Sequence, residues 1–217
     1  AKVITVVAES GDTAPTTPIG INLPNSGWIR KEHGSKSVAL GNIVDAYEQV
    51  ARTSGVTEEF SASKQEAARS KKHGGQGHTL KVDMHEVIGH ASGQLEPGVG
   101  TPKQTLKNYA SALEEARADL VALYYVMDKK LIELGVMASL DVGKAAYDGY
   151  LRNGLLVQLA RIKPGDSIVQ SHMRNRAMVS HWAYEMGKKD KVIERIERDG
   201  NIYFAIRDYD ALRKLWG

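Results

Sequence analysis

The chain has 217 residues, of which 42% are apolar and 6% aromatic, so it can bury one core but is short for two domains of typical size. Its 29 Lys and Arg residues and 26 Asp and Glu residues give a net charge of +3 that is spread along the chain, which argues against nucleic acid as the main partner. No apolar run approaches the roughly 18 residues of a membrane span, and no secretory leader pattern is present, so we expect a soluble protein without a membrane partner. Because the chain has no cysteine, a metal would have to be held by His, Asp or Glu.

The first predicted element is a strand over Val3–Ala8, a mostly apolar run. A turn-rich stretch follows, and Pro24 then favours an extended backbone in the residues before it. From Ser37 to about Thr53, apolar side chains recur at helical spacing, which predicts a helix. The Gly-rich segment Lys71–His78 predicts a surface loop, because it lacks the Gly-Lys-Ser/Thr ending of a phosphate-binding loop.

The rest of the chain is predicted to be mainly helical, which makes the expected fold class mainly α with short β segments at the N- and C-terminal ends. Tyr124, Tyr125 and Trp182 lie at helical spacing from apolar neighbours and are expected in the core. Since Ala1 is not an initiator Met, we interpret the chain as a piece of a longer protein. Helices are predicted at 62–70, 80–90, 104–134 (one helix, or two meeting near Ser111), 139–161, 167–186 and 210–216, and a strand at 201–207.

The most informative segment of the sequence is His85-Glu-Val-Ile-Gly-His90. In the familiar zinc-peptidase helix, two His residues four positions apart lie on one face, with a Glu between them as general base. Here the spacing is five, and five residues of a regular helix advance by about 500°, which leaves the imidazoles roughly 140° apart. A π-type turn with a hydrogen bond from i to i+5 would bring them together, and Gly89 permits that adjustment. Alternatively, this helix simply carries two unrelated histidines.

A second motif, Glu114-Glu-Ala-Arg-Ala-Asp119, offers the carboxylates that a metal site would need. A catalytic zinc ion often takes two His and one carboxylate and leaves its fourth position to water. Glu115 and Asp119 share a helix face with small alanines, which allow another helix to approach closely. This pattern fits one metal ligand and one carboxylate that orients a ligating His. Taken alone, it is more typical of a solvated acidic face paired with Arg117.

Together, the two motifs resemble the paired signature of the dipeptidyl-peptidase III family of zinc exopeptidases. Further similarity in Pro18–Asn25, Ser37–Asn42 and Ser171–Arg176 extends the resemblance over nearly the whole chain. The family's proteins are several hundred residues longer and have two lobes with a cleft between them. The resemblance therefore implies that residues 1–217 form a single zinc-bearing helical lobe, a fragment of a two-lobed protein.

The resemblance also implies how the metal is held. His85, His90 and Glu115 would bind one Zn²⁺ per chain, and Glu114 and Asp119 would hold the ligating imidazoles. This chain departs from the usual pattern in the short connection between its motifs and in having Asp rather than Glu at 119. Because Asp is one methylene shorter, the hydrogen bond from Asp119 to its His is less assured than the ligands.

The remaining roles implied by the resemblance concern the reaction and the substrate. Glu86 would be the general base, and His172 would stabilise the transition state or shuttle a proton. Arg176 would face the peptide, while Asn22 and Asn25 would bind its main chain as an added strand.

The function implied is zinc-dependent removal of dipeptides from the N-terminus of short peptides, in the cytoplasm. Zinc would lower the pKa of a bound water towards 7, so that Glu86 could take its proton and pass it to the leaving amine. The alternative is a catalytically inert metal- or peptide-binding fragment, because the family recognises the substrate's free amino end largely from the other lobe. A third possibility is a helical scaffold with accidental motifs, which would bind no zinc.

Overall fold

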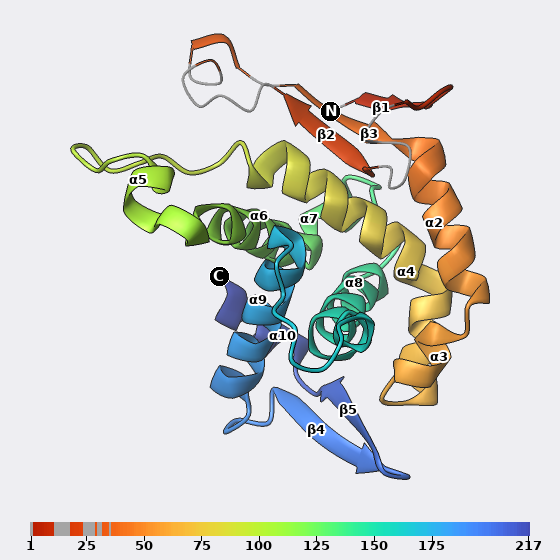
Figure 1. The fold of residues 1–217 in the computed structure, drawn as a ribbon. Coiled ribbons are helices and arrows are strands. Elements are labelled where there is room, and N and C mark those ends of the chain that lie inside the picture. The colour runs from red at the N-terminus through yellow and green to blue at the C-terminus, as the bar shows by residue number, and fades with distance from the viewer. Residues whose placement is uncertain (1, 11–17, 24–28, 30–31, 35) are drawn as a thin grey trace.

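The computed structural model describes residues 2–10, 18–23, 29, 32–34 and 36–217. These residues form a mainly helical body with a small sheet near each end of the chain, so the predicted fold class is confirmed (Figure 1). Among them, no helix combines the length and the apolar character that crossing a membrane requires. The helices are α2 (Gly41–Thr53), α3 (Val56–Phe60), α4 (Lys64–Met84), α5 (Pro102–Leu106), α6 (Ala110–Val126), α7 (Lys130–Glu133), α8 (Asp141–Arg152), α9 (Ser171–Gly187) and α10 (Tyr209–Trp216), with π-helical segments η2 (His85–Gly89) and η4 (Asn153–Val157).

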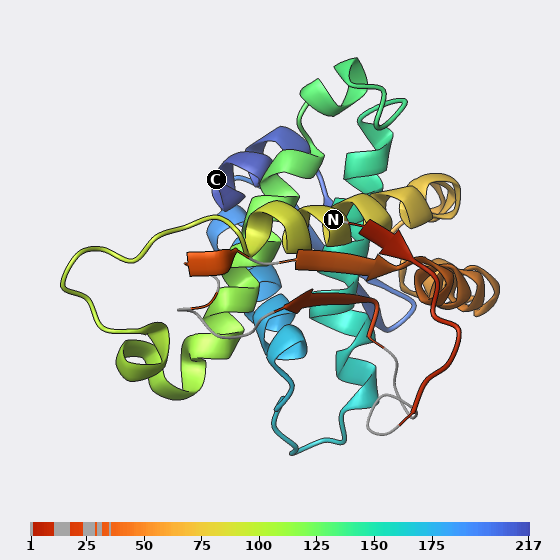
Figure 2. The ribbon, with the colours of Figure 1, turned by 90° about the horizontal axis from the view of Figure 1, so that it is seen from above.

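The N-terminal sheet has the strand order β1-β3-β2, with β1 at Lys2–Ile4, β2 at Gly20–Leu23 and β3 at Lys36–Leu40. The central strand β3 pairs in parallel with β1 and antiparallel with β2. The prediction of a helix from Ser37 was therefore wrong at its start, because the first four positions belong to β3 and the helix begins at Gly41. Pairing with two strands from distant parts of the chain decides the conformation there, which local spacing does not reveal. The sheet lies over α4 (Figure 2).

The helix α4 is continuous through Lys71–His78, so the predicted surface loop was wrong. The side chain of Ser63 caps its first turn by accepting a hydrogen bond from the backbone N–H of Glu66. Gly77 is buried where α4 packs against α8, and a Cβ atom there would lie 2.6 Å from the carbonyl oxygen of Val142. The glycine is therefore needed for the close packing of α4 against α8, although a Gly-rich segment is more typical of a loop.

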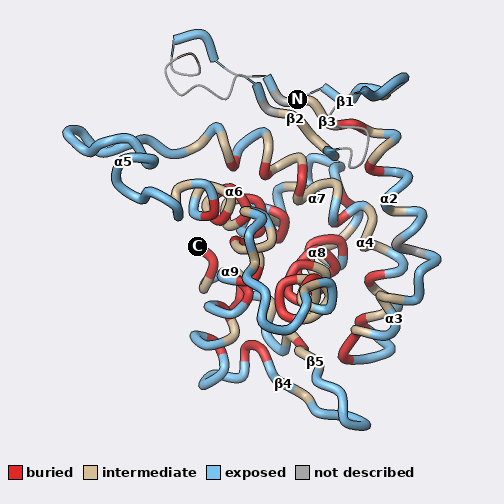
Figure 3. The backbone as a smooth tube through the Cα atoms, viewed as in Figure 1, coloured by how far each residue is buried: buried red, intermediate tan, exposed pale blue. Residues whose placement is uncertain are grey.

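The core lies among α6, α8, α9 and α10, where the buried residues concentrate (Figure 3). Its aromatic side chains come from Tyr147, Tyr150 and Trp216, and the rings of Tyr147 and Trp216 meet edge-on with centroids 4.6 Å apart. The core prediction was wrong for three other aromatic residues, which are partly exposed at the surface: Tyr124 (36%), Tyr125 (45%) and Trp182 (45%).

The C-terminal sheet is a hairpin of β4 (Ile193–Arg198) and β5 (Asn201–Ile206), which confirms the strand predicted near 201–207. Asp199 and Gly200 connect its strands with positive φ angles of 53° and 75°, as a tight hairpin turn requires. Ile193 and Ala205 are buried, so the hairpin closes the end of the core remote from the N-terminal sheet (Figure 1).

We expect Gly77→Ala to lower the free energy of unfolding by about 1–3 kcal/mol, because the added methyl group overlaps the backbone of α8. Gly74→Ala is the matched control on the same helix, since nothing described lies within 4 Å of its added Cβ. This control should be neutral or stabilising by up to about 1 kcal/mol, as alanine favours helix. Urea unfolding followed by circular dichroism measures both, and equal effects of the two substitutions would contradict the packing described.

Candidate metal centre

The two histidines of the central motif are brought together by the π-helical segment η2. The backbone N–H of His90 donates to the carbonyl oxygen of His85 at 3.0 Å, an i to i+5 hydrogen bond. This confirms the predicted widening of the helix, and it places the two imidazole centroids 4.6 Å apart with their planes at 87°.

The close approach of η2 to α6 depends on Gly89. A Cβ atom at this position would lie 2.8 Å from the carbonyl oxygen and 2.9 Å from the Cα of Ala118. The backbones of η2 and α6 therefore touch at Gly89, the residue before His90. The small side chain of Ala118 allows α6 to reach this position.

Three imidazoles surround one oxygen atom of Glu115, which α6 presents to η2. Oε2 of Glu115 lies 3.1 Å from Nε2 of His85 and 3.7 Å from Nε2 of His90. Nδ1 of His172, at the start of α9, is 3.2 Å from the same oxygen. This Oε2 atom is buried and makes no hydrogen bond with any described residue, which is costly for a carboxylate.

The ionised state of Glu115 is favoured in this arrangement. Burial alone would raise the pKa of its carboxyl group, but the neighbouring His172 and His85 lower the pKa to about 2. For His85, burial alone would lower the pKa, whereas the contacts with Asp119 and Glu115 raise it to about 9. The site therefore stabilises positive charge between its carboxylates, as a cation-binding site must.

His85 in η2 and His90 directly after it each have a carboxylate at the other ring nitrogen. Nδ1 of His85 lies 2.8 Å from Oδ1 of Asp119, and Nδ1 of His90 lies 2.9 Å from Oε1 of Glu114. Because an ionised carboxylate only accepts hydrogen bonds, Nδ1 of each ring carries the proton. Nε2 of each ring, the atom that would bind a metal ion in place of a proton, then lies on the side of Glu115.

Arg117 connects Glu114 to the end of η2. Its Nη2 atom donates to Oε1 of Glu114 at 2.7 Å, and its Nη1 atom donates to the carbonyl oxygen of Gly89 at 2.9 Å and to Oγ of Ser92 at 3.0 Å. The sequence suggested this arginine only as a partner in a solvated acidic face, whereas the structure uses it to hold the turn in place.

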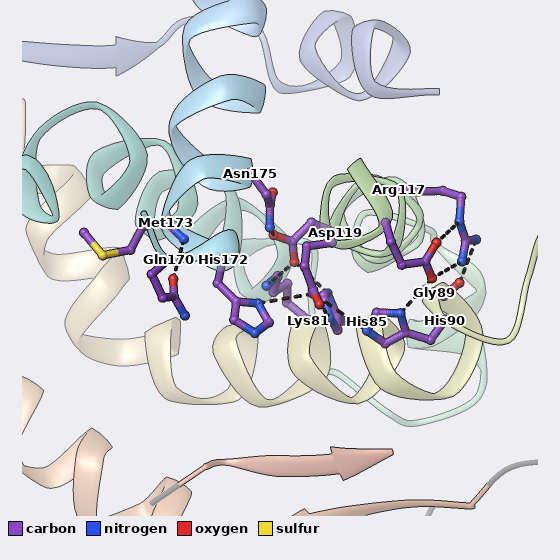
Figure 4. Close-up of polar contacts among 12 residues, drawn as sticks. Lys81, His85, Gly89, His90, Arg117, Asp119, Gln170, His172, Met173 and Asn175 are labelled. Carbon is purple, nitrogen blue, oxygen red and sulfur yellow. Dashed lines mark hydrogen bonds and ion pairs between the residues drawn. The ribbon is translucent and has the colours of Figure 1, made fainter. Parts of the chain in front are cut away.

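Asp119 is the most enclosed member of the cluster, with 1% of its surface exposed. Nζ of Lys81 lies 2.5 Å from its Oδ1 atom, and Nδ2 of Asn175 donates to its Oδ2 atom at 2.9 Å (Figure 4). The hydroxyl of Tyr150 lies 3.1 Å from Oδ2. No sequence motif includes these three neighbours; the one available signal is that Lys81 precedes His85 by four residues and so shares its helix face.

The other expected residues differ in how far the structure places them. Glu86 lies against the sheet, because a Cβ atom on Gly20 of β2 would be 3.5 Å from its Oε1 atom. The side chain of His172 is 52% exposed, and Arg176 donates to Oε1 of Gln158 at 3.1 Å. Asn25 lies outside the described residues; Asn22 belongs to β2, but its side chain is not described.

The donor atoms fit a metal ion in two overlapping groups. His85, Glu115 and His172 form one, and His85, Glu86 and His90 form the other, with the ligand atoms of each group within 4.8 Å of one another. His85 is common to both groups, and the Oε2 atom of Glu115 approaches all three imidazoles. The cluster is thus a possible metal-binding site made of imidazole and carboxylate groups.

The sequence as a whole matches a known peptidase family. The chain matches the model of Peptidase family M49 over residues 11–98 and 96–208, and it belongs to that family. It is 28% identical over 202 residues to dipeptidyl peptidase 3 of Mus musculus, covering 79% of this chain and 27% of that protein. For dipeptidyl peptidase 3 of Nematostella vectensis the identity is 25% over 210 residues, with 82% of this chain and 28% of that protein covered.

A solved structure shows the same fold. Dipeptidyl-peptidase III from Caldithrix abyssi superposes with a TM-score of 0.72 at 23% identity, covering 100% of this chain and 39% of that one. The expected resemblance to the dipeptidyl-peptidase III family is therefore confirmed. The chain spans 27% and 28% of the length of the two curated relatives named above.

We expect Gly89→Ala to reduce the free energy of unfolding by about 1–3 kcal/mol, because its methyl group would push η2 away from α6. Gly149→Ala is a control with the same chemical change in a helix, since nothing described lies within 4 Å of its added Cβ. Thermal unfolding of both variants checks this expectation. A Gly89→Ala chain as stable as the Gly149→Ala chain would show that the backbones of η2 and α6 are not in contact.

Proposed function

We propose that this chain is the zinc-bearing lobe of a dipeptidyl peptidase, with His85, His90 and Glu115 holding the ion. The observation that carries the proposal is the buried Oε2 atom of Glu115, which lacks a hydrogen bond from the described residues and lies between the imidazoles. In a tetrahedral zinc site with bonds of 2.0–2.2 Å, ligand atoms are separated by about 3.4 Å. The distances of 3.1 and 3.7 Å from this oxygen to the two Nε2 atoms bracket that value.

The orienting carboxylates support zinc in particular. A ligating imidazole commonly donates its other N–H to a carboxylate, which fixes both the tautomer and the ring orientation. Asp119 and Glu114 meet Nδ1 of His85 and of His90 in this way. The donor set, two imidazoles and one carboxylate, is the one that many zinc peptidases use.

The reaction follows from the residues beside the ligands. When bound, zinc lowers the pKa of a water towards 7 and polarises the peptide carbonyl. Glu86 follows His85 on η2 and lies at the side of the cluster that faces β2, where it accepts the proton of the attacking water and delivers it to the leaving amine. His172 is half exposed beside Glu115 and stabilises the negative charge that develops on the carbonyl oxygen.

The peptide substrate would bind along β2. In the described part of the sheet β2 is an edge strand, and it lies next to η2. A peptide added to this edge would bring its main chain to the metal cluster, with Asn22 and Asn25 as partners and Arg176 facing it. Release of dipeptides from the N-terminus of short peptides is the activity that we propose, by extension from relatives that carry the name dipeptidyl peptidase 3.

Glu86→Gln tests this proposal, because glutamine cannot take a proton but keeps the shape of the side chain. We expect hydrolysis of a dipeptidyl arylamide to fall by at least ~100-fold, the contribution of a general base, while the zinc content stays at one ion per chain. Metal analysis and the rate of arylamine release measure the two effects.

His85→Ala and Glu115→Gln are the matched controls, and both should lose the zinc ion. A full zinc complement in either control would remove that residue from the ligand set. Retained hydrolysis by Glu86→Gln would exclude it as the base, and a zinc-loaded, unsubstituted chain that releases no dipeptide would contradict the activity proposed for it.

A further inference from the structure

The orienting carboxylate Asp119 depends on a cation that lies outside both sequence motifs. We propose that Lys81 is a positioning residue of the metal centre, whose ammonium group fixes Asp119 so that Asp119 holds His85 in its zinc-binding orientation. This inference rests on the proposed function, because it takes zinc as the metal that His85 binds. Lys81 belongs to α4, four residues before His85.

The carboxylate of Asp119 is a buried charge. Asp119 is 1% exposed, and a carboxylate removed from water to this extent requires a nearby positive charge and several hydrogen bonds. Lys81 supplies the charge at 2.5 Å, from a side chain that is itself only 13% exposed. Burial alone would raise the pKa of Asp119, whereas Lys81 and His85 hold it well below its usual value.

The two oxygens of Asp119 have different partners. Oδ1 lies 2.5 Å from the ammonium of Lys81 and 2.8 Å from Nδ1 of His85. Oδ2 is contacted by Asn175 at 2.9 Å and by Tyr150 at 3.1 Å. The carboxylate is thus held from α4, α8 and α9 at once, and Lys81 shares the oxygen that orients His85. Without Lys81, the Oδ1 atom of Asp119 would keep only its contact with His85.

The other orienting carboxylate, Glu114, also contacts a cation. Glu114 holds His90 and is itself held by Arg117 at 2.7 Å. Both orienting carboxylates therefore contact a cation: Lys81 for Asp119 and Arg117 for Glu114. The pair at Glu114 is about one-third exposed, whereas the pair at Asp119 is almost fully enclosed, so the cation has the larger effect at Asp119.

Lys81→Met keeps the length of the side chain and removes its charge and its donor. We expect the dissociation constant for zinc, measured by competition with a chromogenic chelator, to rise 10- to 100-fold, as is usual when a partner of a ligating histidine is lost. Lys72→Met is the matched control, because Lys72 is exposed on the same helix, and it should leave the constant unchanged. Lys81→Arg, which keeps the positive charge, should stay within a few-fold of the unsubstituted chain; Lys81 lines a cavity of about 310 Å³.

A double-mutant cycle tests whether Lys81 acts through Asp119. Asp119→Asn should weaken zinc binding, and adding Lys81→Met to it should have no further effect on the dissociation constant. This double variant buries no unpaired charge, so the step from Asp119→Asn to the double variant can be measured even if Lys81→Met alone does not fold. A further weakening in the double variant would overturn the proposed route through Asp119.

Other outcomes separate this proposal from its alternatives. If Lys81→Met lowers the melting temperature of the metal-free chain but leaves the dissociation constant for zinc unchanged, Lys81 has only a structural role and the inference is wrong. If zinc binds more tightly to Lys81→Met, the lysine acts by repulsion and the inference is equally wrong. If the unsubstituted chain binds no zinc, the proposed function fails and this inference fails with it.

Discussion

The contact between η2 and α6 at Gly89 and Ala118 is the constraint on which the rest of the site depends. The π-helical turn aligns the two imidazoles, but only the approach of α6 brings Glu115 to the nitrogens that the turn presents. The same approach places Glu114 and Asp119 at the opposite nitrogens of the two rings. One backbone contact therefore sets five side chains at once, and a glycine next to the second histidine is what makes that contact possible.

The charges of the cluster are arranged in alternating layers. Glu115 occupies the centre, the imidazoles surround it, the orienting carboxylates lie behind them, and Lys81 and Arg117 lie outermost. Such a buried arrangement is stable only when each charge meets an opposite one with good geometry. The charged side chains of the cluster come from helices distant in sequence, because no single helix can present all of them to one point.

Part of the site could be predicted because it depends on residue spacings within a single helix. His85 and His90, five residues apart, come to one face of a helix only through a π-type turn. Glu115 and Asp119, at positions i and i+4, share a face of a regular helix. Lys81, Tyr150 and Asn175 escaped prediction because each contacts Asp119 from another helix; the spacing of Lys81 and His85 indicates a shared face but not that contact. The Gly-rich part of α4 was mistaken for a loop for the same reason: Gly77 serves the packing of α4 against α8 rather than a turn. Likewise, Ser37 joins a strand whose partners lie elsewhere in the chain.

The most direct test of the central claim is X-ray absorption at the zinc edge of the zinc-loaded chain. The account predicts two imidazole nitrogens at about 2.0–2.1 Å and a carboxylate oxygen at about 2.0–2.2 Å from the metal. Replacing His90 by alanine should remove one of the two imidazole signals. A spectrum with a single imidazole, or one that the His90→Ala substitution leaves unchanged, would contradict the binding of one ion by both His85 and His90.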